Sequence, residues 1–293
     1  MKKILIGIPT RDRYDDLEAL IQSIEKSHNE LNLGNNYSIC VSDNSVNSKD
    51  FETNEFNISF DLIKQSGKLT MSENWNSLIE YSILNKYDFL ILIPDDDFFQ
   101  INALLHYDRI LSGFDEEIML MSVGNSATFK DLKPLNYYLD KITTIAPGNF
   151  ALKYATEPKL SSRFNSPGMI VVVDKFKESK VRYRKSYSLD KIMFLECNKS
   201  YKIAFLEVNL VKVTTHADQF RNFTNFEQQL KDFHLMSGFI PEKNTFKLFK
   251  RKRYKYLSEI MTWKSYLALI FKTREGLLEL IFNLMVYLKF KLR

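Results

Sequence analysis

An apolar run that leads straight into three aspartates constrains the fold more than any other feature of this sequence. Residues 89–93 are all apolar and partly β-branched, which favours a strand covered on both faces in a parallel sheet. Pro94 ends the strand pattern because it has no backbone N–H to donate to a neighbouring strand, and Asp95, Asp96 and Asp97 follow it. Ligands in open α/β folds bind at the carboxyl ends of strands, so we expect a ligand site here.

The three adjacent carboxylates repel one another, so a cation or a hydrogen-bond network should hold them. Hard oxygen ligands on a short loop suit Mg²⁺ or Mn²⁺, ions that commonly also bind substrate phosphates. A solvated acidic turn is the alternative interpretation. The buried strand that precedes the triplet favours the cation site.

Strand and helix patterns alternate through most of the chain. Strand patterns cover residues 3–8, 37–42, 58–63, 89–93, 118–123, 169–173 and 204–213, and helix patterns cover residues 15–24, 71–84, 103–111 and 189–197. This alternation predicts an α/β fold with a Rossmann-like, mostly parallel central sheet flanked by helices. Prolines punctuate residues 124–166, where we expect loops and short helices that shape the second half of a site.

The cysteines and the amino terminus indicate the compartment. The chain has only two cysteines, Cys40 and Cys197, and Cys40 lies in an apolar strand pattern. A buried thiol in a reducing compartment is therefore favoured over a disulfide or a metal site. Met1 leads through two lysines directly into the first strand pattern, without the features of a signal peptide, so we expect a cytoplasmic protein.

The last 51 residues have a different composition from the rest. Residues 243–293 contain 13 Lys or Arg against three Glu, so they carry +10 while the preceding residues carry −5. Two apolar helical patterns at residues 263–271 and 277–290 are interrupted by charges and are too short to span a bilayer. We expect residues 241–293 to form basic amphipathic helices on an anionic membrane surface, the alternative being a soluble helical hairpin packed on protein.

Three motifs resemble, in order and spacing, the family 2 glycosyltransferases of the GT-A fold. They follow successive strand patterns within roughly the first hundred residues and read Ile8-Pro9-Thr10-Arg11-Asp12-Arg13, Val41-Ser42-Asp43-Asn44-Ser45 and Ile93-Pro94-Asp95-Asp96-Asp97. The resemblance implies a GT-A domain over residues 1–240. Within it, residues 1–123 would form the nucleotide-sugar-binding half and residues 124–240 the acceptor half.

The resemblance also implies which residues bind the donor's nucleotide. Pro9, Thr10 and Asp43 would bind the base, because a carboxylate can accept the imino hydrogen of uracil. Arg11 stands where the family often has an aromatic residue, and a guanidinium plane can also stack on a base. Lys68 and Asn74 match the region near ribose or diphosphate, although Lys68 is equally compatible with an exposed loop.

The acidic triplet matches the family's Asp-X-Asp signature. The resemblance implies that Asp95 and Asp97 bind Mn²⁺ or Mg²⁺ and that Asp95 and Asp96 contribute to the nucleotide-sugar site. Which of the three carboxylates touches the metal directly stays open. His216, after the last strand pattern, would complete the metal site or donate to a phosphate, and a purely structural histidine is the alternative.

One carboxylate in the second half matches the family's general base. Asp190 opens the helix pattern at 189–197, where relatives carry an acidic residue that takes the proton from the acceptor hydroxyl. The alternative for Asp190 is a helix-terminus residue that satisfies backbone N–H groups.

The resemblance predicts an inverting, metal-dependent glycosyltransferase that uses a UDP-sugar. Its acceptor would be a glycan, polyprenyl-linked, in surface polysaccharide synthesis, with the enzyme peripheral on the inner face of the cell membrane and no nucleic acid as partner. A nucleotidyltransferase is one alternative, but no Gly-rich phosphate loop follows the first strand pattern. A non-catalytic adaptor that binds membrane or nucleic acid through the basic segment is another.

Overall fold

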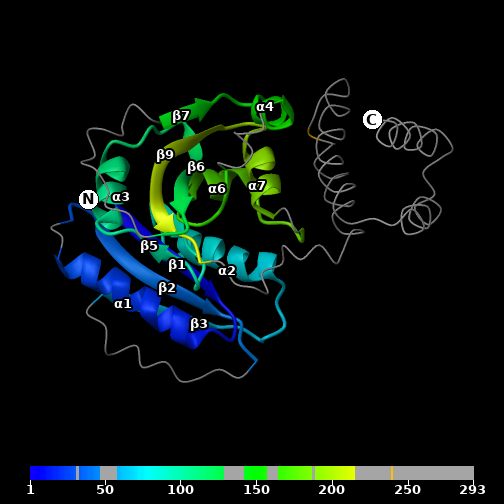
Figure 1. Cartoon of the computed structure of the whole chain (residues 1–293). Helices are drawn as coiled ribbons and strands as arrows, with labels where there is room; N and C mark the ends of the chain where they lie inside the picture. Colours follow the sequence, from blue (N-terminus) through cyan, green and yellow to red (C-terminus); the bar gives the residue numbers. More distant parts are fainter. Residues whose placement is uncertain are drawn as a thin grey trace, which may run out of the picture.

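A nine-stranded sheet with helices on both faces makes up the described part of the chain (Figure 1). The computed structural model describes residues 1–30, 33–46, 58–128, 142–156, 164–186, 189–214 and 239. The strands lie in the order β3-β2-β1-β4-β8-β6-β9-β5, and β7 pairs with β9 off this path. The elements are β1 (Lys3–Thr10), α1 (Tyr14–Glu30), β2 (Asn36–Asp43), β3 (Ser59–Lys64), α2 (Met71–Leu84), β4 (Phe89–Leu92), β5 (Phe98–Phe99), α3 (Ala103–Ser112), β6 (Ile118–Ser126), β7 (Ile142–Ile145), α4 (Phe150–Thr156), β8 (Met169–Val172), α6 (Val173–Ser179), α7 (Leu189–Cys197) and β9 (Lys202–Lys212).

The expected α/β architecture with a mostly parallel sheet is confirmed. Strands β1 to β4 pair parallel to one another, and β6 pairs parallel to β9. Strand β8 is antiparallel to both β4 and β6, and the short strands β5 and β7 run antiparallel to β9. An apolar run does not encode strand direction, so the antiparallel β8 could not be read from its sequence. Val173 also begins α6 rather than ending the strand.

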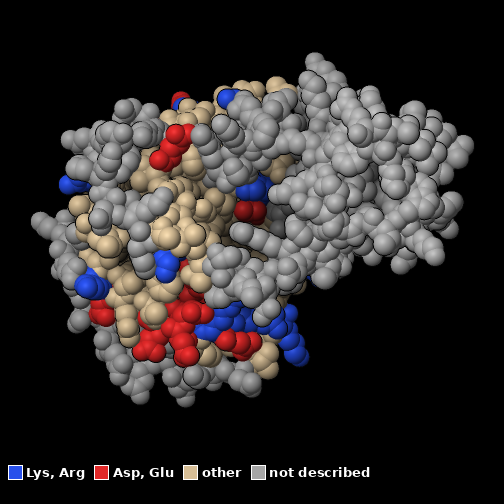
Figure 2. All heavy atoms as spheres, viewed as in Figure 1, with Lys and Arg blue, Asp and Glu red and all other residues tan. Residues whose placement is uncertain are grey.

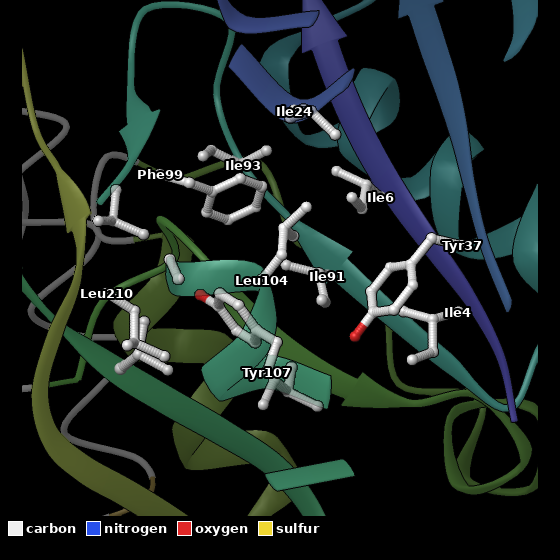
Figure 3. Close-up of a cluster of buried hydrophobic side chains, with 14 of the residues drawn as sticks. Ile4, Ile6, Ile24, Tyr37, Ile91, Ile93, Phe99, Leu104, Tyr107 and Leu210 are labelled. Carbon is white, nitrogen blue, oxygen red and sulfur yellow. The ribbon is translucent and has the colours of Figure 1, made fainter. Parts of the chain in front are cut away.

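Two apolar clusters cover the two faces of the sheet. On β1, Ile4 and Ile6 belong to the cluster with α1 and α3, whereas Leu5 belongs to the cluster with α2, α4, α6 and α7. Figure 3 shows part of the first cluster, with Ile91 of β4 next to Leu104 of α3, and Ile4 and Ile6 of β1 on the side of Tyr37. Successive strand residues point to opposite faces, so both faces of β1 and β4 are buried. The expectation of a strand covered on both faces after residue 89 is confirmed.

A glycine turn brings β8 against the end of β4. Gly168 has a left-handed backbone with φ +73°, and its N–H donates to the Leu92 carbonyl at 2.7 Å. Its own carbonyl accepts from the Tyr107 hydroxyl at 2.7 Å. A Cβ added to Gly168 would collide with the Tyr107 hydroxyl and with Val211. Only glycine suits this position, and the turn places the residues before β8 next to Pro94.

Both cysteines are buried free thiols, as expected for Cys40. Burial raises the pKa of the Cys40 thiol to about 12, so this thiol stays protonated at neutral pH. None of the helices within the described ranges is long and apolar enough to cross a membrane. The expected basic helices of residues 241–293 lie outside the described residues.

Candidate active site at the carboxyl ends of the strands

The carboxyl ends of three neighbouring strands bring the first two motifs to the acidic triplet. Strand β1 lies between β2 and β4, and its last residue, Thr10, pairs in register with Asp43 at the end of β2. The Thr10 hydroxyl donates to Asp95 Oδ2 at 2.7 Å. Figure 2 shows acidic and basic side chains gathered next to one another over the part of the molecule where these strands end and α1 begins. Parallel strands thus place motifs that lie more than 80 residues apart at one edge of the sheet.

The acidic triplet is buried and short of compensating charge. Asp95, Asp96 and Asp97 are 4%, 9% and 3% exposed. Burial raises the pKa of Asp95 to about 6, an effect that the Thr10 hydroxyl and Arg13 partly offset. Burial raises the pKa of Asp97 to about 7, and the neighbouring carboxylates add to the rise against a hydrogen bond from the Thr214 N–H.

One guanidinium contacts two carboxylates of the triplet. Arg13 Nη1 lies 2.6 Å from Asp96 Oδ2 and 3.3 Å from Asp95 Oδ1. The Arg13 carbonyl accepts the Leu17 N–H at 3.0 Å, so this residue also opens α1. Arg13 lies in the first motif, but neither its position there nor the family resemblance assigned it a role. A basic residue just past the end of a strand is the signal that could have identified Arg13, because this fold gathers carboxylates at the same edge of the sheet.

The residues present fit a divalent cation in donor type and in charge. All three side chains of the triplet offer carboxylate oxygens, the preferred ligands of Mg²⁺ and Mn²⁺. Asp97 uses Oδ1 to accept the Thr214 N–H at 2.9 Å, and its Oδ2 has no partner among the residues described. Burial, which raises the pKa values of Asp95 and Asp97, disfavours their negative charge, and a bound cation would offset this cost. Within the described ranges no three His, Cys, Asp or Glu side chains converge as a ready-made metal cage, so water and donor phosphates would provide further ligands.

Asp43 is held in a fixed orientation by its neighbours. Its Oδ1 accepts the Ser45 N–H at 2.9 Å and its Oδ2 accepts the Tyr14 hydroxyl at 2.7 Å. The whole residue is only 2% exposed. Each carboxylate oxygen can accept a second hydrogen bond, so Asp43 can still bind a base edge. Tyr14 was not anticipated at this position.

Asn74, on α2, forms side-chain hydrogen bonds to the ends of both β1 and β2. Its Oδ1 accepts the Ser42 hydroxyl at 2.6 Å, and its Nδ2 donates to the Thr10 carbonyl at 3.2 Å. The residue is 4% exposed. These contacts give Asn74 a positioning role in the structure, while its predicted contact with the donor stays a prediction.

The other predicted donor residues differ in exposure. Pro9 is buried at the end of β1, whereas Arg11 is exposed and its guanidinium lies 3.9 Å from Asp12. Lys68 is exposed in the loop before α2. His216 lies outside the described residues, so its predicted role at the metal stays a prediction.

A cavity of about 390 Å³ lies between the start of α2, the start of α7 and the residue that precedes the acidic triplet. Asp190, at the start of α7, lines it together with Pro94, which immediately precedes Asp95. The apolar wall includes Met71, Trp75 and Leu189. The structure therefore places Asp190 in the wall of the same open cavity as Pro94, the residue before the predicted metal site, although the two are far apart in the sequence.

Two local contacts hold the Asp190 side chain. Its Oδ1 accepts the Lys191 N–H at 2.9 Å, and its Oδ2 lies 3.6 Å from the Lys191 ammonium. Both contacts come from the adjacent residue, and the side chain remains partly exposed. This geometry leaves Asp190 able to accept a further proton donor from the cavity.

Helix α2 is hydrogen-bonded to the segment at Tyr183, which leads into the cavity wall. Asn76 Nδ2 donates to the Tyr183 carbonyl at 2.9 Å, and Asn76 Oδ1 accepts the Tyr183 N–H at 2.8 Å. The Tyr183 ring packs edge-on against Trp75 with ring centroids 5.4 Å apart. These contacts hold the chain just before Lys185, which lines the cavity, on the helix that also supports the donor side.

Solved structures share this architecture, while no family model and no curated protein sequence matches the chain. The crystal structure of S. aureus TarS 1–349 aligns with a TM-score of 0.60 at 11% identity, over 91% of this chain and 77% of that chain. Its complex with UDP-GlcNAc aligns with a TM-score of 0.59 at 11% identity, over 95% and 77% of the two chains. The mannosyltransferase PcManGT from Pyrobaculum calidifontis, in complex with GDP-Man and Mn²⁺, aligns with a TM-score of 0.50 at 8% identity, over 98% and 84%.

These likenesses define the class of fold. The structural neighbours are GT-A glycosyltransferases, and the chain has the GT-A glycosyltransferase fold. The fold that the three motifs implied is thereby confirmed. At identities near 11%, the likeness establishes the fold, and what the chain does has to be argued from its own site.

Proposed function

We propose that the protein is a glycosyltransferase that moves a sugar from a nucleoside diphosphate to a hydroxyl group of a glycan. The observation that carries this proposal is the shared cavity of Asp190 and Pro94 beside the buried acidic triplet. A general base in the cavity wall and a cation-binding cluster next to that cavity are what transfer between a phosphate leaving group and a hydroxyl nucleophile requires. Two of the similar structures were solved as complexes, one with UDP-GlcNAc and one with GDP-Man, which supports a nucleotide-sugar donor.

On the donor side, Asp43 orients the base and the acidic triplet holds the diphosphate end. Asp43 is fixed by Tyr14 and Ser45, so its carboxylate meets an imino N–H without losing side-chain entropy on binding. A divalent cation held by Asp95 and Asp97, Mn²⁺ or Mg²⁺, would supply positive charge to the departing diphosphate. We propose a uridine nucleotide, because a uracil imino group pairs with a single carboxylate.

On the acceptor side, Asp190 acts as general base. It accepts the proton of the acceptor hydroxyl as that oxygen forms a bond to the anomeric carbon. The bond between the anomeric carbon and the phosphate oxygen breaks, and its electron pair leaves with the nucleoside diphosphate. A single displacement of this kind inverts the configuration at the anomeric carbon.

The proposed acceptor is a glycan on a polyprenyl carrier, in surface polysaccharide synthesis at the inner face of the cell membrane. The composition of residues 243–293, with 13 basic residues and interspersed aromatic side chains, supports attachment to an anionic surface. Co-sedimentation of the full chain with vesicles tests this. We expect binding to phosphatidylglycerol vesicles that is lost at high salt and is absent with phosphatidylcholine. Equal binding to both would contradict electrostatic attachment.

Calorimetry with uridine, guanosine, cytidine and thymidine diphosphates, each with and without Mn²⁺, tests the donor site. We expect Mn²⁺-dependent binding of one nucleotide that Asp97→Asn abolishes. Asp174→Asn is the matched control, since Asp174 is an exposed carboxylate in the first turn of α6. If none of the nucleotides binds the wild-type protein under either condition, the proposed function is wrong.

A further inference from the structure

We propose that Arg13 is an exchangeable counter-charge of the acidic triplet, which a divalent cation displaces and which then binds the diphosphate of the donor. The inference rests on the proposed function for its last step only. The first step, competition between the guanidinium and a metal for the same oxygens, concerns the chain by itself.

The contacts of Arg13 occupy oxygens that a cation would need. Nη1 donates to Asp96 Oδ2 at 2.6 Å and to Asp95 Oδ1 at 3.3 Å. The other oxygen of Asp95 already accepts the Thr10 hydroxyl at 2.7 Å. With Arg13 in this position, both oxygens of Asp95 are in use. Each oxygen can accept a second contact, so a cation that takes Asp95 as a ligand has to remove the guanidinium or share the same carboxylate with it.

Charge repulsion makes sharing unfavourable. A divalent ion and a guanidinium on the same buried carboxylate would lie a few ångströms apart, where water screens their repulsion poorly. The side chain of Arg13 is 46% exposed, so it has a path into solvent, whereas those of Asp95 and Asp96 are 6% and 12% exposed. The arginine is therefore the partner that moves.

The backbone keeps Arg13 close to the site when its side chain moves. Asp12 has a left-handed backbone with φ +57°, its N–H donates to Ser45 Oγ at 2.7 Å, and its Oδ1 accepts the Val46 N–H at 3.3 Å. The Arg13 carbonyl opens α1 through the Leu17 N–H. With its Cα fixed at the carboxyl edge, the released guanidinium lies within side-chain reach of the same edge. A diphosphate is the anion that the proposed function brings there, and a planar guanidinium binds phosphate oxygens in bidentate fashion.

This exchange couples metal and donor binding. Displacing Arg13 lowers the affinity for the metal alone, and the contact of the freed guanidinium with the diphosphate restores the loss when both ligands are present. Metal and diphosphate therefore bind with positive cooperativity, because each favours the displaced position of Arg13.

Calorimetric titration of Arg13→Gln in the full chain tests the inference, with MnCl₂ alone and with inorganic pyrophosphate at saturating Mn²⁺. We expect Mn²⁺ alone to bind about 10-fold more tightly than in the wild type, and pyrophosphate to bind about 10-fold more weakly. Arg13→Lys keeps the charge and should stay within about 3-fold of the wild type for Mn²⁺. Arg109→Gln is the matched control, since Arg109 is an exposed arginine in the last turn of α3, away from the acidic triplet, and should change neither affinity.

Three outcomes overturn the inference: unchanged or weaker Mn²⁺ binding by Arg13→Gln, no Mn²⁺ binding by either protein, or unchanged pyrophosphate binding. A thermal melt of each variant separates these results from a loss of fold. The proposed function fails separately. If no nucleoside diphosphate binds the wild type while both shifts occur in Arg13→Gln, Arg13 is an exchangeable counter-charge in a protein with another ligand.

Discussion

The proposed donor and acceptor sides of the site are built by different means. On the proposed donor side, Thr10 and Asp43 end the parallel strands β1 and β2 and are aligned by their pairing, and Asp95 follows shortly after the end of β4. On the acceptor side, Asp190 stands on a helix, and the cavity is closed by turns around an antiparallel strand. The difference shows that strand ends deliver binding groups through local rules, whereas an enclosed cavity needs contacts between distant segments.

Helix α2 links the two sides through two residues on the same turn. Asn74 bonds to Ser42 and Thr10 on the donor side, and Asn76 bonds to both backbone groups of Tyr183 on the acceptor side. Residues two apart on a helix point in different directions, so one helix can brace both sides. The comparison between the sides can therefore be tested by changes that affect one and spare the other.

The largest expected effect is a loss of transfer rate without a change in donor binding. Asp190→Asn removes the proposed general base, and we expect kcat to fall by about 10²- to 10⁴-fold while the Kd for nucleoside diphosphate stays within about 2-fold. Steady-state transfer assays and calorimetry measure the two quantities. Asp174→Asn, an exposed carboxylate of the same half, should leave both unchanged. A parallel loss of nucleotide affinity in Asp190→Asn would show that the two sides are not separable.

The glycine turn of the acceptor side should be sensitive to a single methyl group. Gly168→Ala combines a left-handed backbone with collisions against Tyr107 and Val211, and we expect a loss of about 3 kcal/mol in the free energy of unfolding. Gly148 also has a left-handed backbone, with φ +77°, but an added Cβ would meet nothing within 4 Å. Gly148→Ala should therefore cost only about 1 kcal/mol. Urea unfolding gives both values, and equal losses would refute the packing account of Gly168.

Asp97 should lower the free energy of unfolding of the metal-free protein as pH rises. Its folded-state pKa of about 7 lies above the value of about 3.9 for an unfolded chain, so between these pH values the folded state holds a proton that the unfolded state has lost. The wild-type protein without metal therefore loses stability from about pH 4 to pH 7. Asp97→Asn should be more stable at pH 8 by about 2 kcal/mol. Thermal melts across pH test this, and Mn²⁺ should raise the Tm of the wild type but not of the variant.

The two asparagines of α2 should give the smallest and most selective effects. Asn74→Ala and Asn76→Ala each remove two hydrogen bonds and should each cost about 1 to 2 kcal/mol in the free energy of unfolding. Asn74→Ala should also weaken nucleotide binding, because it frees the end of β1. Asn76→Ala should leave nucleotide binding within about 2-fold and lower kcat instead. Weaker nucleotide binding in Asn76→Ala together with unchanged nucleotide binding in Asn74→Ala would contradict the assignment of the donor and acceptor sides.

The donor side followed from the sequence because its rules are short-ranged. The apolar run before Pro94 and the apolar patterns of β1 and β2 determined buried strands, and polar residues after parallel strands had to meet at one edge. The three motifs in order were enough to imply the GT-A fold. The alternation of strands and helices likewise determined the mostly parallel sheet.

Only the tertiary structure decided the rest, because it depends on partners that are distant in sequence. The direction of β8 comes from pairing with β4 and β6, which no property of residues 169–172 encodes. The contact of Arg13 with the triplet and the closure of Asn74 on two strands appear only when β1, β2 and β4 lie side by side. Asp190 shares a cavity with Pro94 because the Gly168 turn and Asn76 bring the acceptor half against α2 and β4. The sequence determined which chemical groups lie at this edge of the sheet. The packing of distant segments determined which of these groups contact one another.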